Sequence, residues 1–175
     1  MKKALIVVDF QNDFVSGTLG FEKARGLEDK IADKIREYRK GNNDIIFTYD
    51  THYEDYLSTQ EGKNLPVEHC IKDTDGWELF GKIRSMKIPE DKSFEKSTFG
   101  SLELAKFLET KVYDEIELVG LVSNICVISN AVLAKSALPE ANIIVDAQCT
   151  ASFDESMNEK VLDIMSGLQI NVINR

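Results

Sequence analysis

Short runs of apolar residues recur along the chain and predict the strands of a sheet. Ala4–Val8 is continuously apolar, and the segment from Asp44 to Tyr49 is mostly so, which is typical of strands buried on both faces. Similar patterns predict further strands at Ser93–Lys96, Glu115–Gly120, Asn142–Val145 and Ile170–Ile173. The pattern therefore indicates six strands, several of which lie inside the molecule.

Between these strands, apolar residues recur every three or four positions, which predicts helices. In Leu27–Lys40, for example, Ile31, Ile35 and Tyr38 share one face. Further helices are expected at Asp75–Ser85, Leu102–Glu109, Ile125–Leu138 and Glu155–Met165. The helix from Ile125 is apolar almost all round, so we expect it to be deeply buried. The segments 10–20 and 51–72 show no clear period and are expected to be loops.

The alternation of strands and helices predicts the fold class. We expect a single domain over residues 1–175, of the α/β class, with three layers in which helices cover both faces of a central, mostly parallel six-stranded sheet. Binding sites in such sheets lie beyond the carboxyl ends of the strands. Asp9, Asp50, Lys96 and Cys126 all fall at or near such ends.

Cys126 follows a predicted buried strand and a tight turn at Gly120. Ser123 or Asn124 can cap the helix that follows, which places Cys126 in its first turn. The partial positive charge of a helix start favours a thiolate, so Cys126 is placed like a nucleophile. The alternative is a small apolar residue packed in a core helix, because free cysteine is often buried.

Asp9 and Lys96 could serve such a nucleophile. Acyl transfer through sulfur needs a proton carrier, and burial at a strand end can raise the pKa of Asp9 enough for general base and acid work. Lys96 would offset the charge of Asp9 and favour the thiolate of Cys126. Two plainer interpretations stay open: Asp9 caps the following turn, or Lys96 is solvated on the surface.

Asp50, His52 and His69 form a candidate metal site, with Glu61 in the same loop as a further ligand. Alternate side chains in extended backbone point the same way, so Asp50 and His52 can act together. A carboxylate and two imidazoles suit zinc, iron or manganese, and zinc is the metal we favour. The alternative is that both histidines are exposed and unpaired in an irregular loop.

Three aromatic residues, Phe14, Trp77 and Phe99, are candidates for the wall of an apolar pocket. Such residues more often belong to the core, and this is the interpretation we favour for Trp77.

Charge and composition narrow the function classes. The net charge of −9 argues against a nucleic-acid surface and against an anionic membrane surface. No apolar run approaches membrane-spanning length, and Met1–Asp9 fits a strand better than a signal peptide. Three cysteines are too few for a disulfide framework, so we expect a cytoplasmic protein.

Four segments, in order and at compatible spacing, resemble the isochorismatase-like cysteine hydrolases, and within them the nicotinamidases. The segments are Ala4–Phe14, Tyr49–His52 with His69–Gly76, Phe94–Gly100, and Val119–Val127, and the resemblance spans nearly the whole chain. The resemblance implies the Rossmann-type fold of that family, a catalytic aspartate at Asp9, a catalytic lysine at Lys96, and Cys126 as the nucleophile.

The resemblance also implies a mechanism and partners. Cys126 would attack the carbonyl carbon of a small amide, and Asp9 would carry the proton to the leaving ammonia. Backbone N–H groups near Ser123 and Cys126 would form the oxyanion hole, with a cis peptide between Val122 and Ser123. Phe14, Phe99 and Asn124 would contact the substrate, and the metal would hold the pyridine nitrogen of nicotinamide. The resemblance also leads us to expect a homo-oligomer.

The chain departs from the family pattern at two places. The segment after Lys96 is shortened, which makes Lys92 a second candidate for the lysine and changes the pocket wall. No histidine lies between His52 and His69, and Glu61 fits that place only approximately. Three functions therefore remain under comparison: a nicotinamide-deamidating enzyme, a hydrolase of another small amide or ureido compound, and a non-catalytic binding module. Cys70 and Cys149 are expected to be structural.

Overall fold

A six-stranded parallel sheet forms the centre of the computed structural model, which describes residues 1–175. Its strands are β1 (Lys3–Val8), β2 (Asp44–Asp50), β3 (Lys92–Lys96), β4 (Glu115–Leu121), β5 (Asn142–Ala151) and β6 (Asn171–Ile173). The strand order is β3-β2-β1-β4-β5-β6, and every neighbouring pair is parallel. The predicted fold class is confirmed.

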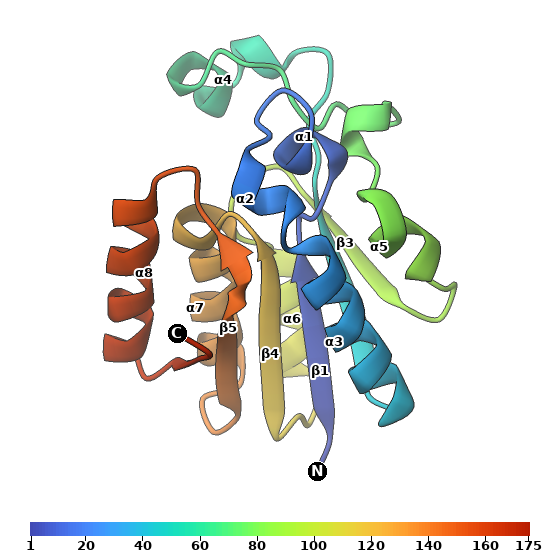
Figure 1. Ribbon diagram of the computed structural model, residues 1–175, viewed down its shortest axis with the longest axis vertical. Helices are drawn as coiled ribbons and strands as arrows, with labels where there is room; N and C mark the ends of the chain where they lie inside the picture. Colours follow the sequence, from blue (N-terminus) through green and yellow to red (C-terminus); the bar gives the residue numbers. More distant parts are fainter.

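Helices cover both faces of the sheet, as Figure 1 shows. One face carries α1 (Asn12–Val15), α2 (Glu22–Arg25), α3 (Glu28–Lys40) and α5 (Gly81–Met86). The other carries α6 (Leu102–Glu109), α7 (Ile128–Ala137) and α8 (Glu155–Gly167). The remaining short elements are η1 (Tyr56–Ser58), α4 (Gln60–Asn64), η2 (Asp75–Trp77) and η3 (Ser123–Val127).

The alternation of side chains along β1 divides the core into two halves. Leu5 and Val7 pack with α3, whereas Ala4, Ile6 and Val8 pack with the helices of the opposite face. All five side chains are fully buried, because a strand at the centre of the sheet is covered on both sides. This burial explains why the sequence of β1 is continuously apolar.

Three predicted elements differ from the structure. The predicted helix at Asp75–Ser85 divides into η2 and α5, separated by the extended residues 78–80. β5 continues past Asp146 to Ala151, and its register against β4 shifts between Leu118 and Gly120. The predicted helix Ile125–Leu138 begins in α-helical form only at Ile128, and it is not buried all round, since Val132 is 39% exposed.

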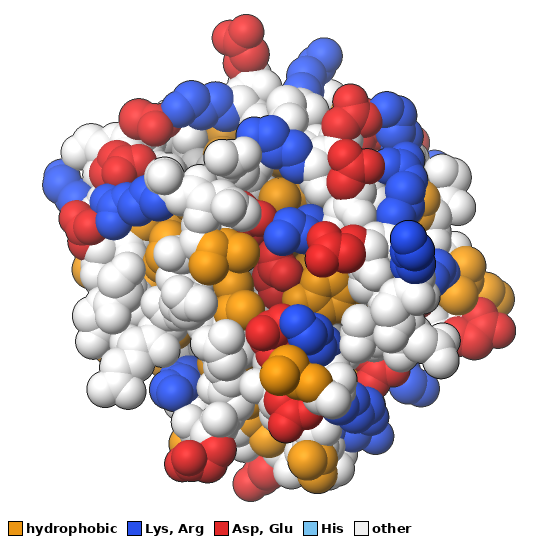
Figure 2. Space-filling model, turned by 60° about the horizontal axis from the view of Figure 1, so that its bottom comes forward, with side chains coloured by type: hydrophobic (Ala, Val, Ile, Leu, Met, Phe, Trp, Pro, Cys, Tyr) orange, Lys and Arg blue, Asp and Glu red, His pale blue; other side chains and the backbone are white.

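The two ends of the sheet differ in character. The segment between β2 and β3, which contains α4, rises above the carboxyl ends of the strands at the top of Figure 1. The opposite end carries basic and acidic side chains interspersed (Figure 2), with ion pairs such as Lys2–Asp44 and Arg39–Asp91. No helix of the structure has both the length and the apolar character that crossing a membrane requires.

Candidate active site

The strand order places a crevice between β1 and β4, because the chain winds outward from β1 in both directions. In open parallel sheets, such a reversal point opens a crevice at the carboxyl ends of the strands. Asp9 follows β1 directly, and Cys126 lies in η3 just after β4. The topology therefore brings together two residues that are far apart in the sequence.

Asp9, Lys96 and Cys126 form a buried cluster at this crevice. The Lys96 Nζ lies 2.6 Å from Asp9 Oδ2 and 3.6 Å from Cys126 Sγ. Their relative exposures are 0%, 6% and 5% in chain order, which excludes the interpretation of Lys96 as a solvated surface lysine. The alternative lysine, Lys92, is exposed at the other end of β3 and does not reach the cluster.

The backbone holds Asp9 in a defined position. Asp9 adopts the left-handed conformation (φ 44°), and its N–H donates to Thr48 Oγ1. The same hydroxyl donates to Asp9 Oδ1 at 2.6 Å. On the neighbouring strand, a Cβ at Gly120 (φ 111°) would lie 2.1 Å from the Val8 carbonyl oxygen, so only glycine allows β4 to pass so close to the residue before Asp9.

Burial and mutual contact set the charges of the cluster. Burial raises the pKa of Asp9 above its ordinary value, although Lys96 opposes the shift. Burial also raises the pKa of Cys126 well above that of a free thiol, again against the effect of Lys96. For Lys96 burial acts against the charge, but Asp9 and the other nearby groups carry its pKa above the ordinary range. Burial therefore favours the thiol form of Cys126, whereas the sequence alone points to a helix start that favours the thiolate.

The turn that carries Cys126 differs from the predicted helix start. Residues Ser123–Val127 form a single π-helical turn, and neither Ser123 nor Asn124 caps it with its side chain. Ser123 Oγ instead donates to Asn158 Oδ1 of α8 at 2.7 Å. The cis peptide lies between Leu121 and Val122, one bond earlier than the resemblance implies. The N–H groups of Ile125 and Val127 both donate to the Val122 carbonyl.

Asp50, His52, Glu61 and His69 come together beside this cluster. One ligand atom from each residue lies within 4.8 Å of the others. Asp50 Oδ2 is 3.0 Å from His52 Nε2 and 3.3 Å from His69 Nε2, and Glu61 Oε1 is 3.7 Å and 3.8 Å from the same nitrogens. Both histidines are buried, so the interpretation of unpaired, exposed loop histidines is wrong.

Three observations show that this group fits a divalent cation. The Glu61 Oε2 atom is buried without a hydrogen-bond partner. Burial and the nearby Asp50 carboxylate raise the pKa of Glu61, which is the repulsion that a cation between them relieves. His69 Nδ1 lies 2.8 Å from the Val67 carbonyl, and donation to that oxygen leaves the Nε2 lone pair facing the group. Two imidazoles and two carboxylates are a donor set that zinc, iron and manganese accept.

Asp50 connects the two clusters. Its Oδ1 lies 3.1 Å from Lys96 Nζ, while its Oδ2 faces the histidines. Burial alone would raise the pKa of Asp50, but Lys96 and the adjacent imidazoles of His52 and His69 hold it well below its usual range. The carboxylate is therefore charged and shared between the lysine and the candidate metal group.

Sequence reasoning missed Gln11, whose side chain fixes the end of β2. Its Oε1 accepts from the Asp50 N–H at 2.8 Å, and its Nε2 donates to the carbonyls of Asp50 (2.9 Å) and Trp77 (2.8 Å). Gln11 is fully buried and thereby replaces a strand partner beyond the end of β1. The sequence shows a glutamine two residues after the candidate base, but its burial and its partners appear only in the fold.

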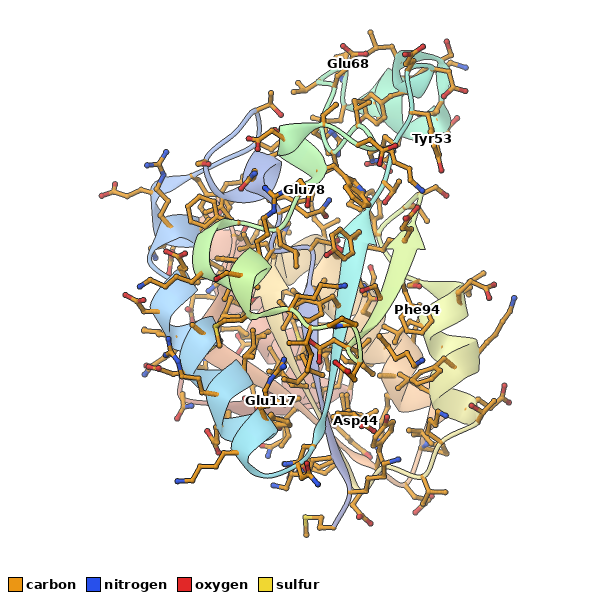
Figure 3. The ribbon with its side chains drawn as sticks, turned by 90° about the vertical axis from the view of Figure 1, so that its right-hand side faces the viewer. Asp44, Tyr53, Glu68, Glu78, Phe94 and Glu117 are labelled. Atoms are coloured by element: carbon orange, nitrogen blue, oxygen red, sulfur yellow. The ribbon has the colours of Figure 1, made fainter.

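A pocket of about 980 Å³ opens above both clusters. It reaches Cys126, Val122 and Ile125 as well as Asp50, His52, Glu61 and His69. The aromatic residues Phe14, Tyr53, Tyr56, Phe99 and Phe153 also line it. Figure 3 shows Tyr53 and Glu68 in the segment above the carboxyl end of β2, far from Asp44 and Glu117 at the other end.

Of the three residues predicted to contact substrate, the structure places two in the lining of the pocket. Phe14 and Phe99 line the pocket, and the Phe14 ring also packs edge-on against His69. Asn124 does not line the pocket, so its predicted contact with substrate has no support in the structure. Trp77 also lies outside it and packs on Tyr49, as favoured from the sequence.

Comparisons with known proteins agree with this geometry. Residues 3–175 match the family model described as the isochorismatase domain. The curated nicotinamidase of Saccharomyces cerevisiae is 28% identical over 216 residues, which cover 99% of this chain and all of that protein. The crystal structure of the nicotinamidase PncA from Bacillus subtilis has a TM-score of 0.86 at 28% identity, covering 98% of this chain and 99% of that one. That of N-carbamoylsarcosine amidase from Thermoplasma acidophilum has a TM-score of 0.82 at 26% identity, covering 98% and 95%.

Because the family model spans almost the whole chain, the chain belongs to the isochorismatase family and is a hydrolase of that family.

Proposed function

We propose that the protein deamidates nicotinamide to nicotinate and ammonia through a thioester on Cys126. The observation that carries this proposal is the contact of Lys96 with both Asp9 and Cys126 at the base of a pocket that also contains the Asp50 group. Relatives named nicotinamidase in yeast and Bacillus subtilis support the choice of substrate.

In the first half of the reaction, the Cys126 sulfur attacks the amide carbonyl carbon. Its thiol proton moves to the Asp9 carboxylate, because the raised pKa of Asp9 suits a group that accepts and returns a proton. When the tetrahedral intermediate collapses, the C–N bond breaks and Asp9 returns the proton to the leaving nitrogen, which departs as ammonia. Lys96 stays charged between the carboxylates and balances their negative charge.

In the second half, water attacks the thioester carbonyl while Asp9 accepts a proton from it. The C–S bond then breaks, nicotinate leaves, and the sulfur recovers its proton from Asp9. Both tetrahedral intermediates need donors for an oxyanion. Since the N–H groups of Ile125 and Val127 are occupied, we assign this role to the N–H of Cys126, in the turn shaped by Val122 and Ser123.

We propose Asp50, His52, Glu61 and His69 as ligands of a divalent metal, with zinc as the favoured ion. When bound, the ion would offer a coordination position for the pyridine nitrogen of nicotinamide. The protein's own contribution is to hold these four side chains in place, through Gln11 on the backbone of Asp50 and through the Val67 carbonyl on His69.

A ureido substrate is the second candidate, because the fold also matches N-carbamoylsarcosine amidase. A C–N bond of a ureido group could be cleaved by the same cysteine chemistry. The aromatic lining of the pocket favours a ring-bearing amide over such a compound. The third interpretation, a binding module without chemistry, leaves the buried Asp9–Lys96 pair beside Cys126 without an explanation.

The proposal is tested by incubating the zinc-loaded protein separately with nicotinamide and with N-carbamoylsarcosine. We expect equal amounts of ammonia and nicotinate from nicotinamide, and little or no ammonia from the ureido compound. If only the ureido compound released ammonia, the second candidate, hydrolysis of a ureido substrate, would replace the proposed function. No ammonia from either, with metal bound, would favour the binding module.

We also propose that the protein works in the cytoplasm, since all three cysteines are free and buried, which fits a reducing compartment.

A further inference from the structure

The pocket above Cys126 has a deep end and an open end. The residues of the two clusters at its base are buried, and so is Phe14, at 8% relative exposure. Exposure then rises to 38% for Leu65, 43% for Phe99 and 66% for Phe153. Together with the half-buried Leu19, these three side chains give the open end apolar surface, and we call the four the outer subsite (Leu19, Leu65, Phe99, Phe153). Exposed polar residues line the same pocket beside them: Asp55, Gln60, Asn64, Ser97 and Thr98.

The pocket is larger than nicotinamide requires. Its volume of about 980 Å³ lies at the upper end of the roughly 300–1,000 Å³ that hold drug-sized ligands. Nicotinamide is a single aromatic ring with one carboxamide. With that carboxamide at Cys126 and the ring at the candidate metal group, the ring occupies the deep end, and the outer subsite remains free.

The lining contains no lysine or arginine. Its charged residues are Asp50, Asp55 and Glu61, together with the two histidines. Lys96 lies below the pocket and is held by Asp9 and Asp50, so its charge is not free for a substrate. Asp50 and Glu61 would balance the charge of a bound divalent ion, which leaves Asp55 as the remaining charge. An anionic group placed in the outer subsite would therefore lose water without gaining a cationic partner.

The outer subsite is built to keep its shape. The Phe153 ring packs edge-on against Phe21, with centroids 6.4 Å apart. Leu19 packs against the hydrophobic core beneath α1. Phe99 and Phe153 come from the segments after β3 and β5, so two separate parts of the chain present apolar surface to one pocket. A preformed surface favours binding, because few side chains lose conformational freedom when a ligand binds.

We propose that the outer subsite binds an uncharged, apolar substituent on the ring of an aromatic carboxamide, and that the pocket discriminates against substrates with a carboxylate or phosphate at that position. The preferred substrate class is therefore a ring-extended neutral carboxamide. This inference rests on the proposed amidase function, since it takes the deep end as the place of the carboxamide.

Binding to the zinc-loaded Cys126→Ala protein, measured by calorimetry, tests the inference without turnover. The probes are nicotinamide and its derivatives with phenyl, carbamoyl or carboxylate at ring position 5 or 6. We expect at least one phenyl derivative to bind about tenfold more tightly than nicotinamide, through burial of the added ring. At the same position, the carboxylate should bind at least about tenfold more weakly than the nearly isosteric carbamoyl compound.

Two substitutions at Phe153 assign these effects to the outer subsite. We express the gain from the phenyl group as the affinity for the phenyl derivative divided by the affinity for nicotinamide. Phe153→Ala should remove most of this gain. Phe153→Lys should improve carboxylate binding about tenfold relative to the carbamoyl compound, because it supplies the missing cation. Leu168→Ala, an exposed position outside the pocket, is the matched control and should leave both ratios unchanged.

The inference would be overturned if neither phenyl derivative bound more tightly than nicotinamide, or if the carboxylate and carbamoyl compounds bound equally. Failure of the proposed function gives a different result. In that case the wild-type protein releases no ammonia from nicotinamide, whichever of the probes binds most tightly.

Discussion

Cys126 is activated by its neighbours and not by the end of a helix. In the structure it lies in a π-turn at the base of the pocket, where it is 5% exposed, and burial raises the pKa of its thiol. A neutral thiol needs a base within reach at the moment of attack. Asp9 can act as this base because burial raises its own pKa, while Lys96, 2.6 Å away, opposes the shift and favours the carboxylate.

The acid limb of the pH profile should report this carboxyl group. Asp9 acts as a base only when ionised, and its pKa in the folded protein lies above the ordinary 3.8. As the pH falls through this raised pKa, kcat/KM for nicotinamide should therefore decline at a higher pH than a free aspartate would give. Asp9→Asn should lower kcat by about 10²–10⁴-fold and abolish this limb. An unchanged limb in Asp9→Asn would assign the titration to another group.

Gln11 is predicted to position the candidate metal ligand Asp50. In Gln11→Leu the Asp50 backbone loses its donor and its acceptor, so zinc affinity should fall by about 10–100-fold, measured by competition with a chelator. His52→Ala removes a ligand and should weaken binding at least as much. Gln148→Leu makes the same substitution at an exposed site and is the control. Wild-type affinity in His52→Ala would show that the four-residue assignment is wrong.

Most of the site could be predicted at the level of single residues. Asp9, Asp50 and Lys96 end or follow strands, and strand ends can be recognised from apolar runs. The position of the cis peptide and the partners of Gln11 could not be predicted, because both depend on how separate strands approach each other. The direction of the Cys126 pKa shift could not be predicted either, because the sequence does not show that the thiol is buried beside carboxyl groups.

At the scale of elements, the approach of β1 to β4 determines where Asp9 and Cys126 lie. Val8 pairs with Gly120 in the parallel register, and the register of β4 against β5 shifts at the same place. The apolar pattern predicts a strand here but does not reveal the shift. The apolar pattern also predicts the residues of the π-turn as the first turn of the helix that contains α7, because both segments carry apolar residues at similar spacing.

Gly120→Ala should disturb the close contact between β1 and β4. The new Cβ would meet the Val8 carbonyl at 2.1 Å in a backbone conformation that other residues rarely adopt, so we expect a loss of at least about 2 kcal/mol in the free energy of unfolding. Gly167→Ala, with no atom within 4 Å of the added carbon, should change it by less than about 0.5 kcal/mol. Equal denaturation midpoints for the two variants would contradict this account.

A buried ion cluster joins α3 to the sheet on the side away from Cys126. Lys34 Nζ lies 2.7 Å from Glu117 Oε1 and 3.0 Å from Asp146 Oδ2, and Tyr38 donates to Glu117 Oε2. Lys34→Met would leave two buried carboxylates without their cation and should cost about 2–4 kcal/mol of stability in urea denaturation. Lys40→Met, on the exposed part of the same helix, is the control. If Lys34→Met and Lys40→Met lowered the free energy of unfolding by the same small amount, the ion cluster would contribute little to stability.

At the scale of the whole molecule, the sequence was sufficient for the architecture. Alternating apolar runs and helical periods indicate a parallel sheet covered on both faces, and the structure confirms it. The site then follows from the strand order, which places the reversal point between β1 and β4. The strand order itself is not visible in the periodicity, since it depends on which apolar faces pack together. The predicted homo-oligomer stays a prediction.

The pocket is also a property of the whole molecule. Its lining comes from the loops after β1, β2, β3, β4 and β5, which meet only in the folded chain. The sequence predicts a changed wall from the short segment after Lys96. It does not predict the outer subsite, because Leu19, Leu65 and Phe153 belong to segments without any recognisable motif.

The central claim is that Cys126 carries the acyl group in the deamidation of nicotinamide. It is tested most directly by ammonia release from nicotinamide in zinc-loaded wild-type, Cys126→Ala and Cys149→Ala proteins, the last removing a buried cysteine outside the pocket. The account predicts release by the wild-type and Cys149→Ala proteins and a loss of at least about 10³-fold in Cys126→Ala with unchanged zinc content. Release by Cys126→Ala at the wild-type rate would contradict it.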